Sequence, residues 1–504
     1  MPVVPVGGAS LSHHIVPVAL TCSWLVLLCH TAFGQKPAKL PLIGRKPFIA
    51  AFNAPLDMCA IKYNITANID QLFQIHGSPR AGCTGQNVTI FYANRLGYYP
   101  YVTPQGTTVH GGVPQNCSLD LHLFKAYKDI KHFIPAEDFR GLAVIDWEFW
   151  RPQWRRNWHK KDIYRRKSME LTAKAYINVT AVQVEELARK RFEKSARTFM
   201  QRTIQLGMHL RPSGLWGFYL YPDCHNYNLH EHNYKGFCPL SEKLSNNELL
   251  WLWNSSSALF PSVAIRKNHA NSINNLYFAQ HRIRESLRVA SLTAKEYDLP
   301  TYVYLRLGYR EDALAFLTMK DLIHTIGESA ALGAAGFVIW GDLNLTSSRY
   351  NCTKVKSFLN HRLGQYITNV THAAQICSDF LCQGNGRCIR RDPHARHYLH
   401  LSADSHRIRP SGNGDFTVMG WHSHHELQWL TDRFRCHCYE GHEGERCDSI
   451  NEVTEDDRQW GEEEEQERRR SEWEDEQLDS GQSVAPPTGC SCHMVVLLLL
   501  LNLV

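Results

Sequence analysis

The chain lacks any apolar run long enough to cross a membrane as an ordinary helix. Residues 15–33 form an apolar stretch near the amino end, and residues 495–504 form another that only Asn502 interrupts. A spanning helix needs about 20 predominantly apolar residues. Lysine and arginine are also missing ahead of the first stretch, where His13 and His14 stand instead. Both stretches therefore fit targeting segments that are removed after synthesis better than membrane spans.

The two apolar ends differ in their flanking residues. The first closes with Ala32-Phe33-Gly34, a small-x-small cleavage pattern, so residues 1–34 are predicted to be a secretory signal peptide. The second, within residues 484–504, comes after small residues and is typical of a glycolipid-anchor signal that is cleaved off. A soluble product that keeps its apolar end is the alternative. The attachment position stays open among Ser480, Gly481, Ser483, Gly489 and Ser491.

Cysteine and glycosylation signals agree on the compartment. Sixteen cysteines are typical of an oxidising environment. Behind the signal-like segment come eight Asn-x-Ser/Thr sequons, which favour a glycoprotein of the secretory pathway that ends at the cell surface, outside the cell or in the lysosome. The acceptor asparagines are Asn64, Asn87, Asn116, Asn178, Asn254, Asn344, Asn351 and Asn369.

Charge is distributed unevenly along the chain. Residues 452–479 hold 14 acidic and four basic residues, which leaves 51 basic and 35 acidic residues elsewhere. The acidic run has too few apolar side chains to form a core, so residues 449–483 are predicted to be a disordered, charged stalk. The basic remainder favours a polyanionic partner. Because the compartment argues against nucleic acid, an acidic polysaccharide is the expected partner; a basic surface without such a partner is the alternative.

Short apolar runs alternate with longer helical patterns between residues 46 and 370. The helical pattern is clearest over residues 182–210. Nearly continuous apolar strands separated by helices are typical of a parallel sheet covered on both faces. Seven such units predict an α/β fold, a distorted seven-stranded (β/α) TIM-like barrel with one strand fewer than usual. The expected strands are residues 48–52, 88–92, 142–146, 215–219, 261–265, 302–306 and 336–340.

Two carboxylates stand at the end of one expected strand. Asp146 and Glu148 are two residues apart, so a strand would direct both to the same face, about 7 Å apart. The carboxyl ends of barrel strands form the active-site mouth. Two close carboxylates in a partly apolar site have pKa values that are pushed apart, so that one keeps its proton. An apolar wall would come from Trp147, Phe149 and Trp150. The structural alternative is that both acids simply pair with neighbouring arginines such as Arg151.

The sequence around these carboxylates resembles a known enzyme family. Residues 143–154 read Ala-Val-Ile-Asp-Trp-Glu-x-Trp-Arg-Pro-x-Trp, residues 215–224 read Leu-Trp-Gly-Phe-Tyr-Leu-Tyr-Pro-Asp-Cys, and residues 327–336 read Gly-Glu-Ser-Ala-Ala-Leu-Gly-Ala-Ala-Gly. These motifs are similar to those of the hyaluronidase family of glycoside hydrolases. The resemblance covers roughly residues 46–447. Residues 45–51 and 339–346 are most similar to the type-4, glycolipid-anchored branch.

The resemblance implies a retaining, substrate-assisted glycosidase that needs no cofactor and no metal. Glu148 would be the proton donor, and Asp146 and the Tyr219 hydroxyl would orient the acetamido group of the substrate. Packing inside the barrel is the alternative for Tyr219 and Trp340, and a helix-surface position is the alternative for Arg282. Arg282 would contact a uronate carboxylate or supply charge support. The cleft positions that match the family are Tyr92, Asp223, Arg282 and Trp340.

One position departs from the family pattern. Many members carry tyrosine where this chain has Ala264, after Phe260-Pro-Ser. The smaller side chain opens space beside the hexosamine, which favours chondroitin or its sulfated forms over hyaluronan. A hyaluronan-preferring enzyme, and a surface receptor that binds glycosaminoglycan without cutting it, are the competing interpretations. The glycolipid anchor would make the membrane a further partner, and a monomer is expected.

Cysteine spacing near the carboxyl end defines a second module. The pattern Cys-x-Cys-x8-Cys after two short spacings resembles an EGF-like module, expected over residues 373–448 with a long insertion, behind a catalytic domain over residues 35–372. A zinc site is the disfavoured alternative outside the cytosol. The partners of Cys83 and Cys117 stay open. Resemblance implies the pairs Cys59–Cys352, Cys224–Cys238, Cys377–Cys388, Cys382–Cys436 and Cys438–Cys447.

Overall fold

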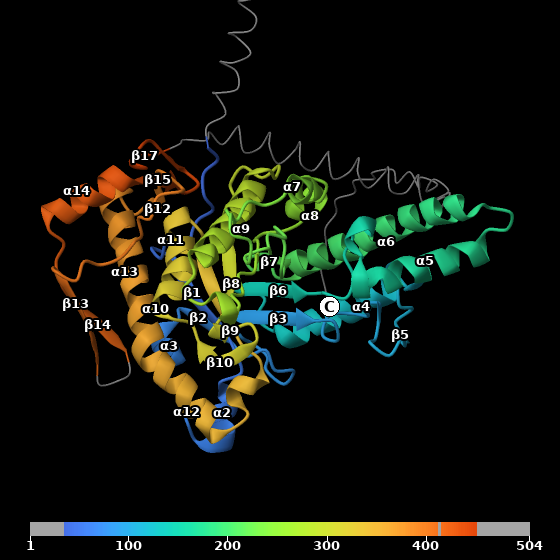
Figure 1. Cartoon of the computed structure of the whole chain (residues 1–504), viewed down its shortest axis with the longest axis horizontal. Helices are drawn as coiled ribbons and strands as arrows, with labels where there is room; N and C mark the ends of the chain where they lie inside the picture. Colours follow the sequence, from blue (N-terminus) through green and yellow to red (C-terminus); the bar gives the residue numbers. More distant parts are fainter. Residues whose placement is uncertain (1–34, 412–414, 451–504) are drawn as a thin grey trace, which may run out of the picture. The chain divides into compact units, whose positions relative to one another are not determined.

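Short parallel strands occupy the centre of the molecule (Figure 1). The computed structural model describes residues 35–411 and 415–450. Four strands form one parallel sheet in the order β2-β1-β11-β8, and three form another in the order β3-β6-β7. Their bounds are β1 Ile49–Asn53, β2 Ile75–Gly77, β3 Val88–Tyr92, β6 Leu142–Asp146, β7 Leu215–Phe218, β8 Tyr302–Arg306 and β11 Gly336–Trp340. The sequence therefore predicted six of these seven strands to within a residue.

The seventh expected strand, residues 261–265, is not a strand. Residues 259–262 instead make isolated parallel bridges, from Phe260 to Tyr219 after β7 and from Ser262 to Tyr304 in β8. Pro261 lies between the two bridges and has no N–H to donate, so a regular ladder is interrupted there. The strand that the sequence missed is β2, which has three residues and exposes His76. So short a run carries too little pattern to be predicted.

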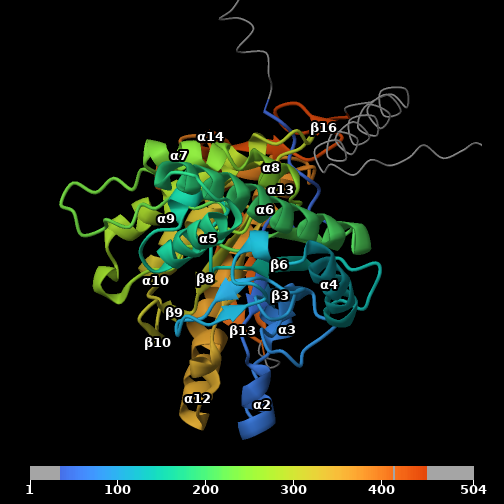
Figure 2. The same cartoon turned by 90° about the vertical axis from the view of Figure 1, so that its right-hand side faces the viewer.

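Helices surround the strands on both sides (Figures 1 and 2). In Figure 1, α4, α5 and α6 lie to the right of the strands, α13 and α14 lie to the left, and α12 lies below them. The helices are α2 Asp57–Tyr63, α3 Ile69–Leu72, α4 Leu119–Phe133, α5 Asp162–Ala175, α6 Ala181–Leu210, α7 Leu240–Asn247, α8 Leu250–Asn254, α9 Ile273–Ser291, α10 Met319–Leu322, α11 Glu328–Leu332, α12 Arg349–Phe358, α13 Gly364–Leu381 and α14 His424–Arg433. None in the described part of the chain is long and apolar enough to cross a membrane.

The predicted helix 182–210 is confirmed as α6, and a capping box explains where it begins. The backbone N–H of Gln183 donates to the Thr180 hydroxyl at 3.3 Å, and the Thr180 N–H donates to the Gln183 side chain at 2.8 Å. These bonds satisfy two N–H groups that a helix start otherwise leaves unpaired. Phe192 and Phe199, two turns apart, are buried against the neighbouring core, so the apolar face of the helix packs as its spacing predicts.

Antiparallel pairs dominate the carboxyl-terminal part. Strand β12 (Gly386–Arg390) pairs with β15 (Phe434–Cys438). Helix α13 runs continuously through residue 372, where the expected domain boundary lies. Three disulfides join this part, Cys377–Cys388, Cys382–Cys436 and Cys438–Cys447. The remaining short strands are β4 Tyr101–Val102, β5 Thr108–Val109, β9 Gly308–Tyr309, β10 Asp312–Phe316, β13 His406–Pro410, β14 Phe416–Gly420, β16 His442–Glu443 and β17 Ser449–Ile450.

A buried ion pair connects the carboxyl-terminal part to the helices around the sheets. Arg390 in β12 donates two hydrogen bonds to Glu328 in α11, at 2.5 and 3.0 Å, and both side chains are fully buried. Gln280 in α9 donates to the same carboxylate at 2.8 Å. Because this carboxylate is fully hydrogen-bonded, three elements are held together at one point.

The other cysteines fall into two groups. Cys59 and Cys352 form a disulfide between α2 and α12, and Cys224 and Cys238 form one across a short loop. All five disulfides are the pairs that the resemblance implied. Cys83 and Cys117 are unpaired and half-buried. The expected signal peptide, the anchor signal and nearly all of the stalk lie outside the described residues.

Candidate active site

The site is built from the last residues of the parallel strands. Strands β3, β6, β8 and β11 are buried at every position except the final one, which is half-buried. Those final residues are Tyr92, Asp146, Arg306 and Trp340. Tyr219, directly after β7, is half-buried in the same way. Because neighbouring parallel strands end at the same edge of a sheet, their polar ends are exposed together where the apolar runs stop.

Asp146 and Glu148 differ in their surroundings. Glu148 lies two residues beyond Asp146 and is exposed. Asp146 is largely buried, and its Oδ1 atom has no hydrogen-bond partner within the described residues. Burial, and secondly the negative charge of Glu148, raise the pKa of Asp146 to about 8, although the positive charge of Arg151 opposes the shift. With its pKa raised in this way, the Asp146 carboxyl keeps its proton near neutral pH.

Aromatic stacking fixes the segment that carries Glu148. The ring of Trp147 stacks on Tyr99 with centroids 4.5 Å apart, and Phe149 stacks on Tyr101 at 4.2 Å. The Trp150 indole donates to the carbonyl oxygen of Pro100 at 2.7 Å. Trp147 and Trp150 are buried, so they anchor the segment in the core more than they line an open wall.

Lys161 adds a second anchor that the sequence did not reveal. Its ammonium group donates to the backbone carbonyl oxygen of Glu148 and, at 3.1 Å, to that of Phe149. Burial, and secondly the nearby Arg151 charge, lower the pKa of Lys161 to about 8, against the opposing effect of Glu148. The lysine thus joins the loop after β6 to the start of α5. Only the folded loop brings residues 148 and 161 together, so no local motif could have shown this contact.

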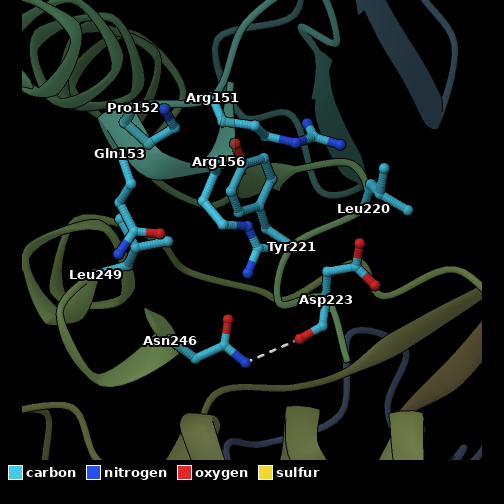
Figure 3. Close-up of a pocket in the computed structure, with 9 residues that line it drawn as sticks. All are labelled: Arg151, Pro152, Gln153, Arg156, Leu220, Tyr221, Asp223, Asn246 and Leu249. Carbon is cyan, nitrogen blue, oxygen red and sulfur yellow. Dashed lines mark hydrogen bonds between the residues drawn. The ribbon is translucent and has the colours of Figure 1, made fainter. Parts of the chain in front are cut away.

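Arg151 does not form an ion pair with either candidate carboxylate within the described structure. Its guanidinium lies over the ring of Tyr221 at 5.2 Å, as Figure 3 shows. Its backbone N–H donates to the Asn157 side chain at 2.8 Å. The cavity beside them has a volume of only about 10 Å³, too small for a sugar. Among the described residues, Arg155 and Arg156 pair with Glu248 and Glu242, and no arginine forms an ion pair with Asp146 or Glu148, so the alternative of simple pairing with neighbouring arginines is wrong.

Tyr219 points its hydroxyl at the bridging segment 259–262. The hydroxyl lies 3.1 Å from the Ser262 hydroxyl, and the ring meets Tyr304 edge to face at 5.1 Å. Burial, and then the charges of Glu148 and Asp146, raise the pKa of Tyr219 above its ordinary value. The phenol therefore stays protonated and able to donate a hydrogen bond.

Trp340 and Tyr92 meet across the two sheets. The Trp340 indole donates to the Tyr92 hydroxyl at 3.1 Å, and the Arg306 guanidinium lies 4.5 Å from the Trp340 ring centre. Burial is the main cause that raises the pKa of Tyr92 to about 12. These contacts place an aromatic and a cationic side chain at the same edge as Asp146.

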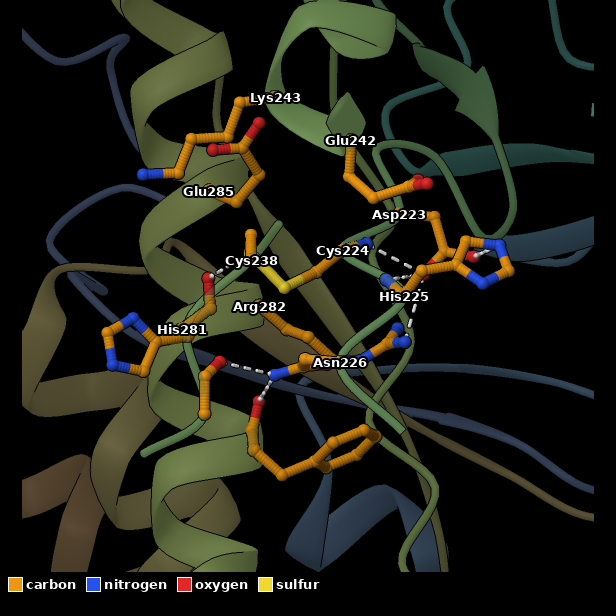
Figure 4. The surroundings of a disulfide bond; sticks show 12 residues. Asp223, Cys224, His225, Asn226, Cys238, Glu242, Lys243, His281, Arg282 and Glu285 are labelled. Atoms are coloured by element: carbon orange, nitrogen blue, oxygen red, sulfur yellow. Dashed lines mark hydrogen bonds and ion pairs between the residues drawn. A yellow bond between two sulfur atoms is a disulfide. The ribbon is translucent and has the colours of Figure 1, made fainter. Parts of the chain in front are cut away.

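Asp223 and Arg282 form a buried pair behind this edge (Figure 4). Arg282 Nη2 lies 2.9 Å from Asp223 Oδ1, and only 2% and 8% of the two side chains are exposed. Burial alone would raise the pKa of Asp223, but Arg282, His225 and Arg151 hold it well below its ordinary range. Arg282 also donates to the Asn226 side chain at 3.0 Å and to the Ser262 carbonyl at 3.1 Å. Its placement fits charge support and not direct contact with a uronate.

Ala264 is half-buried and lines a separate cavity of about 230 Å³. The sequence predicted free space beside this small side chain, and the cavity lies at that position. Within the described residues no cluster of three histidine, cysteine, aspartate or glutamate side chains is arranged to hold a metal ion.

Carboxylates, phenols and an indole at the carboxyl ends of buried parallel strands are an arrangement suited to hydrolysing a sugar linkage on an α/β fold. Comparison with known proteins gives the family: a model of the hyaluronidases, glycoside hydrolase family 56, matches residues 37–451. The chain belongs to this hyaluronidase family and is a glycoside hydrolase.

Individual relatives and solved structures agree with the family match. The chain is 56% identical to human hyaluronidase-4 over 438 residues, which is 86% of this chain and 91% of the human protein. It is 44% identical to the hyaluronidase PH-20 of Macaca fascicularis over 416 residues, 82% of this chain and 80% of that protein. The crystal structure of bee venom hyaluronidase with a hyaluronic acid tetramer is similar, with a TM-score of 0.54 and 29% identity, over 63% of this chain and 97% of that one.

Proposed function

We propose that the chain is an endo-β-N-acetylhexosaminidase that hydrolyses β-1,4 hexosamine–glucuronate linkages of glycosaminoglycans. The observation that carries this proposal is the coupled carboxyl pair, Asp146 and Glu148, at the end of β6. A solved relative, bee venom hyaluronidase, holds a hyaluronic acid tetramer, which supports a polyanionic sugar as the substrate. The basic surplus outside the stalk supports the same class of ligand.

In the first step, Glu148 donates a proton to the glycosidic oxygen. The acetamido oxygen of the substrate attacks the anomeric carbon, the bond from that carbon to the leaving oxygen breaks, and an oxazolinium-like intermediate forms. Asp146, whose pKa burial raises to about 8, holds a proton near neutral pH, and we propose that this proton passes to Glu148 when substrate binds. With the proton on Glu148, an ionised Asp146 balances the positive charge that develops on the acetamide.

In the second step, Glu148 acts as the base. Its carboxylate takes a proton from water, the water oxygen bonds to the anomeric carbon, and the acetamido oxygen leaves, so that the configuration is retained. Tyr219 donates a hydrogen bond to the acetamido group through a phenol that stays protonated. Tyr92 and Trp340 flank the sugar, and Asp223 with Arg282 supports the segment that carries Ser262.

The test of this mechanism is product analysis with Glu148→Gln. The variant keeps the size of the side chain and loses the titratable proton, so hydrolysis of chondroitin and hyaluronan should fall by at least about 100-fold. Leu121→Gln, an exposed change on α4, is the control and should retain activity. If the unchanged protein binds both polymers but cuts neither, the receptor interpretation replaces this one.

The proposed preference is for chondroitin, because Ala264 leaves a cavity of about 230 Å³ where a tyrosine would stand. Ala264→Tyr should lower the ratio of kcat/KM on unsulfated chondroitin to that on hyaluronan, with an expected change of about 10-fold for lost fit in one subsite. Ala264→Leu separates bulk from the hydroxyl. Equal turnover of the two polymers by the unchanged protein, or an unmoved ratio in both variants, would support the hyaluronan-preferring alternative.

The same proposal extends to architecture. The two parallel sheets would be parts of one distorted seven-stranded barrel, supported by the bridges of residues 259–262 on one side and by contact between β2 and β3 on the other. The three disulfides among residues 377–447 and the paired strands β12 and β15 support an EGF-like module.

The expected location is the cell surface by way of the secretory pathway, with a glycolipid anchor and a monomeric chain. Five disulfides among the described residues support an oxidising compartment. Of the eight sequon asparagines, six are exposed, while Asn351 and Asn369 are half-buried. Release of the protein from intact cells by a phospholipase specific for glycolipid anchors would test the anchor directly.

A further inference from the structure

The cavity beside Ala264 combines an apolar base with cationic side chains. Its volume is about 230 Å³. Buried Ile265 and Phe278 form part of its lining. The basic side chains that line it are His230, Arg266, His269 and Arg310, and Asn268 adds an amide. No aspartate or glutamate is among the described residues of the lining, so the cavity is suited to an anionic ligand.

Arg310 offers the charge that is most available to a ligand. Its side chain is exposed, and its guanidinium has no hydrogen-bond or ion-pair partner in the described part of the chain. Its backbone N–H donates to the Ile265 carbonyl at 2.8 Å, which fixes the residue to the cavity lining. Arg266, by contrast, lies 3.5 Å from the Glu311 carboxylate, with both side chains about half exposed. Because an ion pair this exposed is weak, the positive charge of Arg266 can act on a ligand in the cavity together with that of Arg310.

The cavity is near the proposed chemistry. Ser262, whose hydroxyl lies 3.1 Å from that of Tyr219, is two residues from Ala264, and two residues of chain span at most about 7 Å. The Arg282 guanidinium lies 4.5 Å from the ring centre of Tyr227 and 4.6 Å from that of Phe278, and both of these residues line the cavity. The cavity is therefore lined by residues that contact Arg282, which in turn binds Ser262 beside Tyr219.

We propose that this cavity is a subsite for a sulfate ester on a chondroitin chain, with Arg310 as its principal ligand. The inference rests on the proposed function, because it requires a glycosaminoglycan in the cleft. A sulfate ester offers three terminal oxygens to the guanidinium and imidazole N–H groups of the lining, one more than a carboxylate offers. The volume also exceeds what a bare carboxylate fills, and Ala264 leaves room for the substituent.

The test compares sulfated and unsulfated chondroitin of equal length with wild type and Arg310→Gln. Loss of one charge-assisted contact should lower kcat/KM on the sulfated polymer by about 10-fold or more, mainly through KM. The value on the unsulfated polymer should stay within about twofold. Arg140→Gln is the matched control, since Arg140 is exposed and precedes β6, at the opposite end of that strand from Asp146. It removes the same charge and should change neither value.

Two results would overturn the proposal. An equal fall in kcat/KM on both polymers would mean that Arg310 binds uronate carboxylates or attracts the polyanion as a whole. No fall on either polymer would mean that the cavity does not bind sulfate through Arg310. Calorimetric titration of sulfated and unsulfated tetrasaccharides into wild type and Arg310→Gln separates the subsite from the reaction. If wild type cuts no polymer, the proposed function fails, yet a sulfate-dependent difference in Kd that Arg310→Gln abolishes would still support the subsite.

Discussion

At the scale of the residue, the site depends on how one exposed carboxyl is held. Glu148 lies just beyond the end of β6, where strand hydrogen bonds no longer fix the backbone. Stacking of Trp147 and Phe149 fixes the segment on one side, and Lys161 binds its carbonyl oxygens. A proton donor must be placed within hydrogen-bond distance of the oxygen it protonates, so small displacements of this segment are costly for the rate.

Lys161→Met should therefore slow catalysis while leaving substrate binding nearly intact. The change removes both hydrogen bonds to the segment, and kcat should fall by about 10-fold or more, with KM within about threefold. Steady-state kinetics on chondroitin and hyaluronan measure this. Lys160→Met is the control, because Lys160 is exposed and immediately adjacent. A proportional loss of folded protein in circular dichroism, with normal kcat per folded molecule, would contradict a positioning role.

The sequence indicated some residues of the site, while others could be found only from contacts that the fold creates. Asp146 was expected because it ends an apolar run, whereas Tyr219 and Trp340 were expected from motifs that resemble the family. Lys161 and Ser262 act through contacts with residues that only the fold brings near. Arg282 was expected for its matching motif, but its burial could not be anticipated, since a single arginine on a helix has the same sequence pattern whether it is exposed or paired.

At the scale of the element, the strands were predictable because both of their faces are buried. Five consecutive buried residues in β1, and four followed by a polar end in β6, give the continuous apolar runs of a covered parallel sheet. The expected strand 261–265 is absent because Pro261 limits residues 259–262 to isolated bridges. The three-residue β2 failed because its pattern is too short. Errors thus fell where hydrogen bonding, not hydrophobicity, decides the element.

The connection between α11 and β12 should be the most costly polar contact to break. Arg390→Met would leave the fully buried Glu328 without its cation, a loss of about 3–5 kcal/mol in the free energy of unfolding. Urea denaturation followed by circular dichroism measures it. The double variant Arg390→Met with Glu328→Gln removes the unpaired charge and should recover part of the loss.

Arg433→Met is a suitable control for that experiment, because its ion pair with Asp432 is long, at 3.7 Å, and partly exposed. It should change stability by less than about 1 kcal/mol. An Arg390→Met protein as stable as the control would show that Gln280 and the surrounding packing suffice to hold the carboxylate.

At the scale of the whole molecule, the described residues 35–411 and 415–450 belong to one compact unit. Helix α13 continues across residue 372, and the buried pair of Arg390 and Glu328 joins the parts on either side of it. The spacing of the cysteines indicated a separate module, because spacing reflects only which cysteines close together in the sequence form disulfides. It carries no information on how tightly such a module packs against its neighbour, which depends on buried contacts between distant residues.

The disulfide between Cys224 and Cys238 has a consequence beyond holding a loop. Cys224 donates its backbone N–H to Asp223 at 2.7 Å, Asp223 binds Arg282, and Arg282 binds the carbonyl of Ser262, whose hydroxyl meets Tyr219. A chain of four contacts thus runs from a covalent bond that forms only under oxidising conditions to the phenol of the site. The enzyme would therefore become active only once this disulfide has formed. A newly synthesised chain whose cysteines are still reduced would be a poor catalyst, whether or not a polysaccharide is present.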